Sequence, residues 1–163
     1  YESTTWFIIW FNVDNNGANG NQAFSKSAPS ISEQEFNMRV RESISEVDFN
    51  VSSGGSSSSD AGVVIPGPNQ WVMFYGAYDD TGGAETIYAS VNDGAVNIDT
   101  LPNSPNRFTQ PLEIGALTDQ SEYFEGDLGL FLYGKKPNVS DSLPHEDGTL
   151  TDYYTFTQNQ AGL

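Results

Sequence analysis

The chain has 163 residues, which is enough for one domain with a sizeable core, and it contains no cysteine. Disulfides, thiolate metal sites and a cysteine nucleophile are therefore excluded. Its 22 acidic residues against 6 basic ones give a formal charge of −16, which disfavours binding to nucleic acid or to an anionic membrane surface. No stretch is long and apolar enough to predict a membrane span.

The acidity fits either solubility in a salty or extracellular setting or the binding of divalent cations at acidic loops. The chain begins with Tyr1, which suggests a mature form or a segment of something longer. We expect a single domain over 1–163, placed outside the cell, on a cell surface or on a virion surface.

The first half of the chain predicts strands. Residues 4–13 are apolar on both faces, as in a strand at the centre of a sandwich. A Gly/Asn loop over 14–22 and a short strand over 23–26 follow. In 36–41 and 45–51 apolar and polar residues alternate strictly, which is typical of half-buried strands. The polar positions of these two strands are expected to face one another across a hairpin: Asn37, Arg39, Arg41, Glu46, Asp48 and Asn50.

The Ser/Gly-rich stretch 52–62 predicts a loop. Strands are then expected near 70–75, 86–91, 111–115 and 124–133, and the turn Asn92-Asp93-Gly94 after the second of them is a strong hairpin signal. Residues 97–110 carry two prolines and predict a surface connection. The region 137–163 predicts an irregular tail, in which 149–157 is either a last strand or a short helix, with the strand favoured.

The order of these signals resembles the laminin-G-like jelly rolls of the concanavalin A-like lectin/glucanase superfamily. The residues that carry the resemblance are Trp71, Asp79, Tyr88, Asp93-Gly94, Leu112-Ile114-Gly115 and Phe124-Gly126. The resemblance implies an all-β fold, a two-sheet antiparallel β-sandwich. The usual strand before the Trp6 region has almost no room here. This missing strand could come from upstream sequence, from the tail, or from a neighbouring subunit that adds its own strand to the sheet.

Glu46 and Asp48 are the candidates for catalysis, because laminarinase-type enzymes of this superfamily carry several acids at alternate positions of one strand. Retaining glycoside hydrolysis needs two carboxyl groups close together. Here the third position is Asn50, which is not an acid. We therefore expect no enzymatic activity, with a laminarinase-like hydrolase as an alternative.

No other cofactor than Ca²⁺ is suggested, and Ca²⁺ itself would use loop oxygens. The candidate ligands are Asp14, Asn16, Asp79 and Asp80. Turn formation alone also explains Asp, Asn and Gly at such positions. One histidine and no cysteine exclude a structural zinc site.

Candidates for ligand contact lie near turns: Tyr78, Asp79, Asn92, Asp93 and Tyr123. Tyr153 and Tyr154 are further candidates for exposed rings, whereas the three tryptophans are expected in the core. The first functional hypothesis is a non-catalytic surface module that binds a glycan or a surface protein through loops at one end of the sandwich. The alternative is a structural subunit of a virion or filament that uses the sandwich for self-association or assembly with a host structure.

Overall fold

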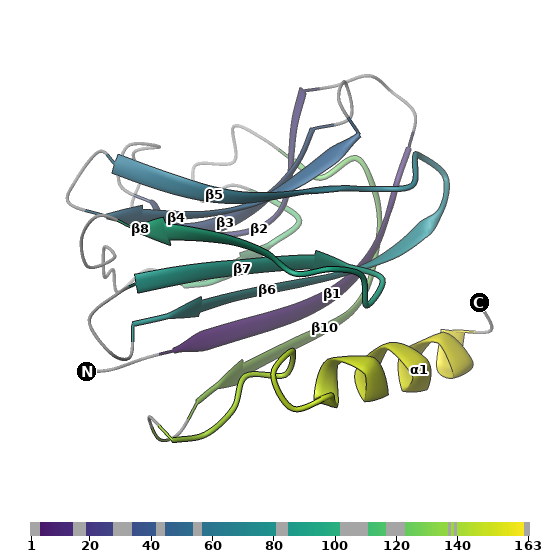
Figure 1. The fold of residues 1–163 in the computed structure, drawn as a ribbon. Coiled ribbons are helices and arrows are strands. Elements are labelled where there is room, and N and C mark those ends of the chain that lie inside the picture. Colours follow the sequence, from purple (N-terminus) through teal and green to yellow (C-terminus); the bar gives the residue numbers. More distant parts are fainter. Residues whose placement is uncertain are drawn as a thin grey trace.

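The computed structural model describes residues 4–14, 19–27, 34–41, 45–53, 57–80, 85–101, 111–116, 123–136, 138 and 140–161. These residues form two five-stranded antiparallel sheets and one helix (Figure 1). The first sheet has the order β10 (Gly126–Lys135), β1 (Thr5–Val13), β6 (Trp71–Asp79), β7 (Glu85–Val91) and β8 (Asn97–Leu101). The second has the order β5 (Ser57–Val64), β4 (Glu46–Ser53), β3 (Gln34–Arg41), β2 (Asn19–Ser27) and β9 (Glu113–Ile114).

The main core lies between the two sheets and is rich in phenylalanine. Phe7 of β1 lies with its ring centroid 4.8 Å from that of Phe36 and 5.0 Å from that of Phe24, both on the opposite sheet. The alternation predicted for β3 and β4 sends their apolar side chains into this core. The all-β sandwich prediction is therefore confirmed.

A second cluster covers the other face of the first sheet, beneath helix α1 (Thr149–Ala161). In Figure 1 the helix runs alongside this sheet, on the side away from the second sheet. Trp10 stacks on Tyr154 with centroids 5.9 Å apart and ring planes 8° apart. This cover explains why β1 and β6 are apolar on both faces.

The preference for a final strand in the tail is wrong, because 149–161 is a helix. Its sheet-facing residues Leu150, Tyr153, Tyr154 and Thr157 follow the three-and-four spacing of a helix rather than a period of two. The side chain of Asp147 accepts a hydrogen bond from the backbone N–H of Thr149 at 3.0 Å and so caps the first turn. Tyr153 and Tyr154 are half-buried against the tryptophans and are not exposed rings.

Three expected loops are partly strands. Residues 57–64, inside and just beyond the Ser/Gly-rich stretch 52–62, form β5 along β4. Ala61 opposite Phe49 lies in the core, and the absence of a Cβ at Gly62 leaves space for the carboxylate of Glu46. Residues 97–101 form β8, and 19–22 belong to β2. Within the described residues, no helix is long and apolar enough to cross a membrane.

Candidate functional site

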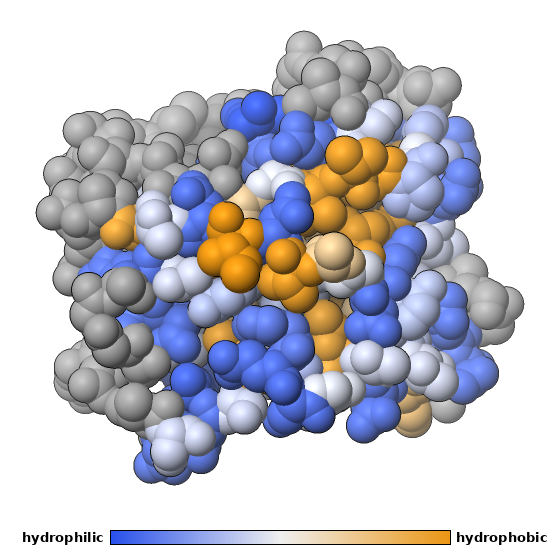
Figure 2. Space-filling view, viewed as in Figure 1, coloured by the Kyte–Doolittle hydropathy of each residue, from blue (hydrophilic) through white to orange (hydrophobic). Residues whose placement is uncertain are grey.

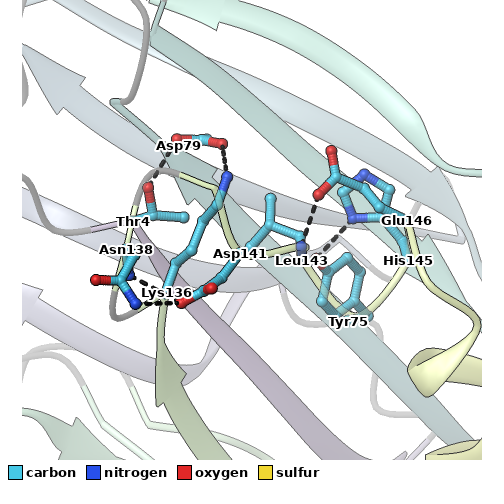
Figure 3. A network of polar contacts seen from close by, with 9 residues as sticks. All are labelled: Thr4, Tyr75, Asp79, Lys136, Asn138, Asp141, Leu143, His145 and Glu146. Atoms are coloured by element: carbon cyan, nitrogen blue, oxygen red, sulfur yellow. Dashed lines mark hydrogen bonds and ion pairs between the residues drawn. The ribbon is translucent and has the colours of Figure 1, made fainter.

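Two groups of predicted site residues fall at opposite ends of the first sheet. Asp79 closes β6 at the end where β1 begins, and it is buried. Its carboxylate accepts hydrogen bonds from the Thr4 hydroxyl at 2.7 Å and from the Lys136 ammonium at 3.3 Å (Figure 3). Both members of the ion pair are nearly covered, with side chains 12% and 7% exposed for Asp79 and Lys136. This pair ties the start of β1 and the end of β10 to β6.

Tyr78 lies in the core rather than at the surface, with 2% of the residue exposed. Its hydroxyl donates to the Asp80 carboxylate at 2.9 Å. The two acids proposed as Ca²⁺ ligands here thus accept hydrogen bonds from neighbouring side chains. Within the described parts of the chain, no group of three or more acidic or histidine side chains is placed to hold a metal ion.

The single histidine also lies against this sheet. His145 Nδ1 is 2.8 Å from the Tyr75 hydroxyl, and its ring centroid is 4.5 Å from that of Tyr88. Burial lowers the pKa of His145 below its ordinary value, while Glu146, Asp147 and Asp79 act in the opposite direction. Burial likewise raises the pKa of the Tyr75 hydroxyl, so that it stays neutral.

The candidate catalytic strand β4 points its polar row away from the core, on the outer face of the second sheet. Asp48 is fully buried there and forms ion pairs with Arg41 and, at 3.7 Å, with Arg39. The predicted pairing of the arginines with this row is confirmed by the β3–β4 register. Asp48 thus has a charge-pairing role that explains it without catalysis, and Asn50 at the third position supplies no acid.

At the opposite end of the first sheet, Asn92 and Asp93 form the turn between β7 and β8. Both have positive φ angles, 51° and 58°, and the Gly94 N–H donates to the Val91 carbonyl at 2.9 Å. This is the geometry of the predicted tight hairpin turn. The Asn92 side chain accepts a hydrogen bond from the Met73 N–H at 2.9 Å, and Asp93 accepts one from the Thr151 hydroxyl at 3.1 Å.

An open groove of about 520 Å³ lies beside this turn, where the end of β5 meets the β7–β8 hairpin. Its lining is mostly apolar and consists of Val63, Val64, Ile65, Pro66, Val91, Asn92, Gly94, Ala95 and Asn97. Val64 is 73% exposed and Ile98, on neighbouring β8, is 64% exposed. Figure 2 shows apolar residues gathered in this region, where β5 passes β8. We call this surface the β5/β8 groove.

The remaining candidates lie apart from the groove. Tyr123 is exposed, as expected, and pairs through an isolated bridge with Ala116. Asp14 is exposed at the end of β1, and its backbone N–H donates to the Glu125 carbonyl at 3.3 Å. Asn16 lies outside the described residues. Of all the predicted contact residues, Asn92 alone is among the residues that line the groove.

Residues 3–132 match the concanavalin A-like lectin/glucanases superfamily, and the chain belongs to this superfamily. A search of curated proteins found no match. Among solved structures, the chain is similar to domains LG4-5 of the mouse laminin alpha1 chain, with 12% identity and a TM-score of 0.59. That alignment covers 88% of this chain and 40% of the laminin chain.

The chain is also similar to the CBM40 of the Ruminococcus gnavus IT-sialidase, a structure bound to alpha2,3 sialyllactose. The identity is 10%, the TM-score is 0.67, and the match covers 94% of this chain and 83% of that one. A SAP-like pentraxin of Limulus polyphemus matches with 15% identity and a TM-score of 0.58, over 89% of this chain and 68% of that one. At these identities the likeness shows the fold alone.

Sequence reasoning missed the apolar part of the groove. Val63, Val64 and Ile65 follow a Ser/Gly-rich stretch and were not assigned to a strand. The available signal was the run of three branched apolar residues before Pro66. Such a run is too short to indicate by itself which of its side chains is buried and which is exposed.

Proposed function

We propose that this chain is a non-catalytic recognition module, working outside the cell, that binds a glycan or a protein at the end of the sandwich where the β7–β8 turn lies. The observation that carries the proposal is the open β5/β8 groove, formed partly by the turn that contains Asn92. Concave, mostly apolar surfaces with a few polar groups are the usual form of binding sites. Among the similar structures, a carbohydrate-binding module bound to alpha2,3 sialyllactose supports a binding role.

A hydrolase is the less favoured reading. Glycoside hydrolysis uses one carboxyl group as acid and another as nucleophile or base. On β4 the buried Asp48 is held between two arginines, and the residue two places further on is Asn50. Charge pairing of Asp48 accounts for the row of polar side chains.

Self-assembly, as in a virion or filament subunit, is the second candidate. It is favoured by strand β10, which is ten residues long and has β1 as its neighbour at the end of the first sheet. Leu130 and Tyr133 on this strand are 44% and 48% exposed. An edge strand with exposed apolar residues can pair with another copy.

Binding arrays test the recognition role. Wild-type protein is applied to a glycan array and to an array of purified cell-surface and matrix proteins, beside two variants. Ala95→Trp fills the groove, and Leu130→Trp adds the same side chain at the far edge. We expect at least one array ligand to bind both wild type and Leu130→Trp, and we expect Ala95→Trp not to bind that ligand. Hydrolysis of laminarin, or a defined oligomer with no array ligand, would instead support the enzyme or the assembly subunit.

A further inference from the structure

The apolar part of the β5/β8 groove's lining is aliphatic, and Asn92 and Asn97 are its polar members. None of its nine lining residues is aromatic, so it offers no flat ring on which a sugar could stack. Val64 and Ile98 expose 73% and 64% of their surface beside it. Clustered apolar exposure of this kind marks sites of protein contact more often than isolated surface residues do. The walls therefore fit an aliphatic side chain better than a sugar ring.

The groove also lies along a sheet edge. β5 ends the second sheet and β8 ends the first, and each has a single strand neighbour within the described residues. The Gly62 carbonyl, instead of pairing with β4, accepts a hydrogen bond from the Asn97 side chain of β8. Because strand backbone groups alternate in direction, those of Val64, two residues on, point to the same side, where β5 leaves β8 and the groove opens. An extended segment can pair with backbone groups of this kind.

Acidic side chains stand around the groove. Asp99 is half-exposed on β8, two residues from Asn97 in the lining. The Glu46 carboxylate lies over Gly62, where an added Cβ would collide with it. Arg41 lies opposite Glu46 on the neighbouring strand β3 and offsets its charge, so Asp99 is the acid left for a partner. None of the described cations lies on β5 or β8. A cationic partner is attracted to this surface, whereas a second copy of a chain with a charge of −16 is repelled.

We propose that the β5/β8 groove binds an extended, cationic segment of a partner protein. The segment passes the end of β5 at Val64, places a branched aliphatic side chain in the hollow there, and sets a Lys or Arg side chain next to Asp99. This inference rests on the proposed recognition function and narrows its ligand from glycan or protein to a basic protein segment.

The test uses a short fluorescein-labelled peptide of alternating lysine and valine, and fluorescence anisotropy as the readout. Two control peptides separate the contributions: one replaces each valine with serine, and the other replaces each lysine with glutamate. We expect wild type to bind the lysine–valine peptide at least about tenfold more tightly than either control. Binding should weaken as salt is raised, because screening reduces attraction between exposed charges.

Variants of the protein locate the binding. Ala95→Trp should lower the affinity for the lysine–valine peptide by at least about tenfold, while Leu130→Trp should leave that affinity unchanged. Asp99→Asn should lower the affinity about twofold to threefold, and the matched change Asp127→Asn on β10 should have no effect on it. Circular dichroism and thermal melting confirm that each variant is folded. Equal binding by Ala95→Trp, or equal binding of the glutamate peptide, overturns the proposal.

Two further outcomes separate this inference from the recognition function. A glycan found on the array that still binds Ala95→Trp overturns the basic-segment proposal and leaves a recognition module with another site. Dimerisation of wild type that Ala95→Trp abolishes, seen by light scattering, shows that a second copy fills the groove and also overturns it. Absence of any ligand on both arrays and with the peptides contradicts the recognition function itself.

Discussion

The two ends of the first sheet carry similar polar residues and use them differently. At one end, Asp79 lies inside the protein and bonds to Thr4 and Lys136. At the other, the Asn92-Asp93 turn borders an open groove with exposed Val64 beside it. Both ends were predicted to hold site residues because acids and amides follow strands there. The difference is whether a cation from another strand covers the acid, and that depends on the fold.

An acid that follows a strand in the sequence is therefore weak evidence for a binding site. Asp79 joins three strands of one sheet, so its first role is to hold the end of the sandwich together. The binding surface proposed at the other end depends mainly on apolar residues that no motif marks. Four predictions test this division of roles, in order of decreasing expected effect.

The largest effect should come from breaking the buried ion pair. Lys136→Met leaves the buried Asp79 carboxylate without its cation, and we expect the free energy of unfolding to fall by about 3 kcal/mol or more. Chemical denaturation followed by circular dichroism measures this. The double variant Lys136→Met/Asp79→Leu should recover much of the loss. A single variant as stable as wild type would show that the pair does not hold this end together.

The next effect concerns helix α1, which packs on the outer face of the first sheet and contacts the Asn92-Asp93 turn through Thr151. Leu150 is 3% exposed, and Leu150→Ala should lower the free energy of unfolding by about 2 kcal/mol or more. The exposed Phe156 on the same helix is the control, since Phe156→Ala should change stability little. Tryptophan fluorescence adds a local readout, because Trp6, Trp10 and Trp71 pack in the cluster under the helix. Equal losses of stability in Leu150→Ala and Phe156→Ala would contradict the packing of this face of the helix on the sheet.

A smaller effect should appear on acidification. Because burial lowers the pKa of His145 in the folded protein, the unfolded chain binds the proton more readily. The stability that neutral His145 contributes is present above its unfolded pKa of about 6.5 and is lost as pH falls through the lower folded value. Glu146, Asp147 and Asp79 oppose this shift, while Tyr75 and Tyr88 stay neutral at these pH values.

Denaturation of wild type and His145→Gln between pH 7 and pH 5 measures that contribution, and the difference removes the titration of carboxylates common to both. We expect the stability of wild type to fall more steeply than that of His145→Gln. Parallel curves would mean that His145 is not held neutral against Tyr75.

The smallest effect on stability is expected at the groove. Ala95 is exposed, so Ala95→Trp should change the free energy of unfolding by no more than about 0.5 kcal/mol while it blocks binding. Thermal melting checks the first part of this statement. A large loss of stability would mean that the groove is part of the fold rather than an open surface.

The sequence predicted most of the fold, because alternation of apolar residues reports directly on strands with one buried face. The pairing of Arg39 and Arg41 with the polar row of β4 followed from the same rule. Strand β5 was missed because backbone hydrogen bonds to β4, rather than its Ser/Gly composition, make it a strand. For 149–157 the strand was favoured over the helix because residues 153–156 alternate, although the wider spacing is that of a helix.

The candidate site was less predictable. The turn at Asn92 was visible from its residues, since few sequences favour two successive positive φ angles. The partners of Asp79 come from residues 57 and 75 positions away in the chain. Exposure of Val64 likewise depends on how β5 passes β8. Contacts of this range are set by the packing of sheets and leave no local pattern.

The most direct test compares the two ends in one binding measurement. Surface plasmon resonance of the strongest array ligand is recorded with wild type, with Ala95→Trp at the groove and with Asp80→Asn at the opposite end. We expect Ala95→Trp to lose binding while Asp80→Asn keeps the affinity of wild type. Loss of binding in Asp80→Asn with full affinity in Ala95→Trp would place recognition at the opposite end of the sheet and contradict the proposed site.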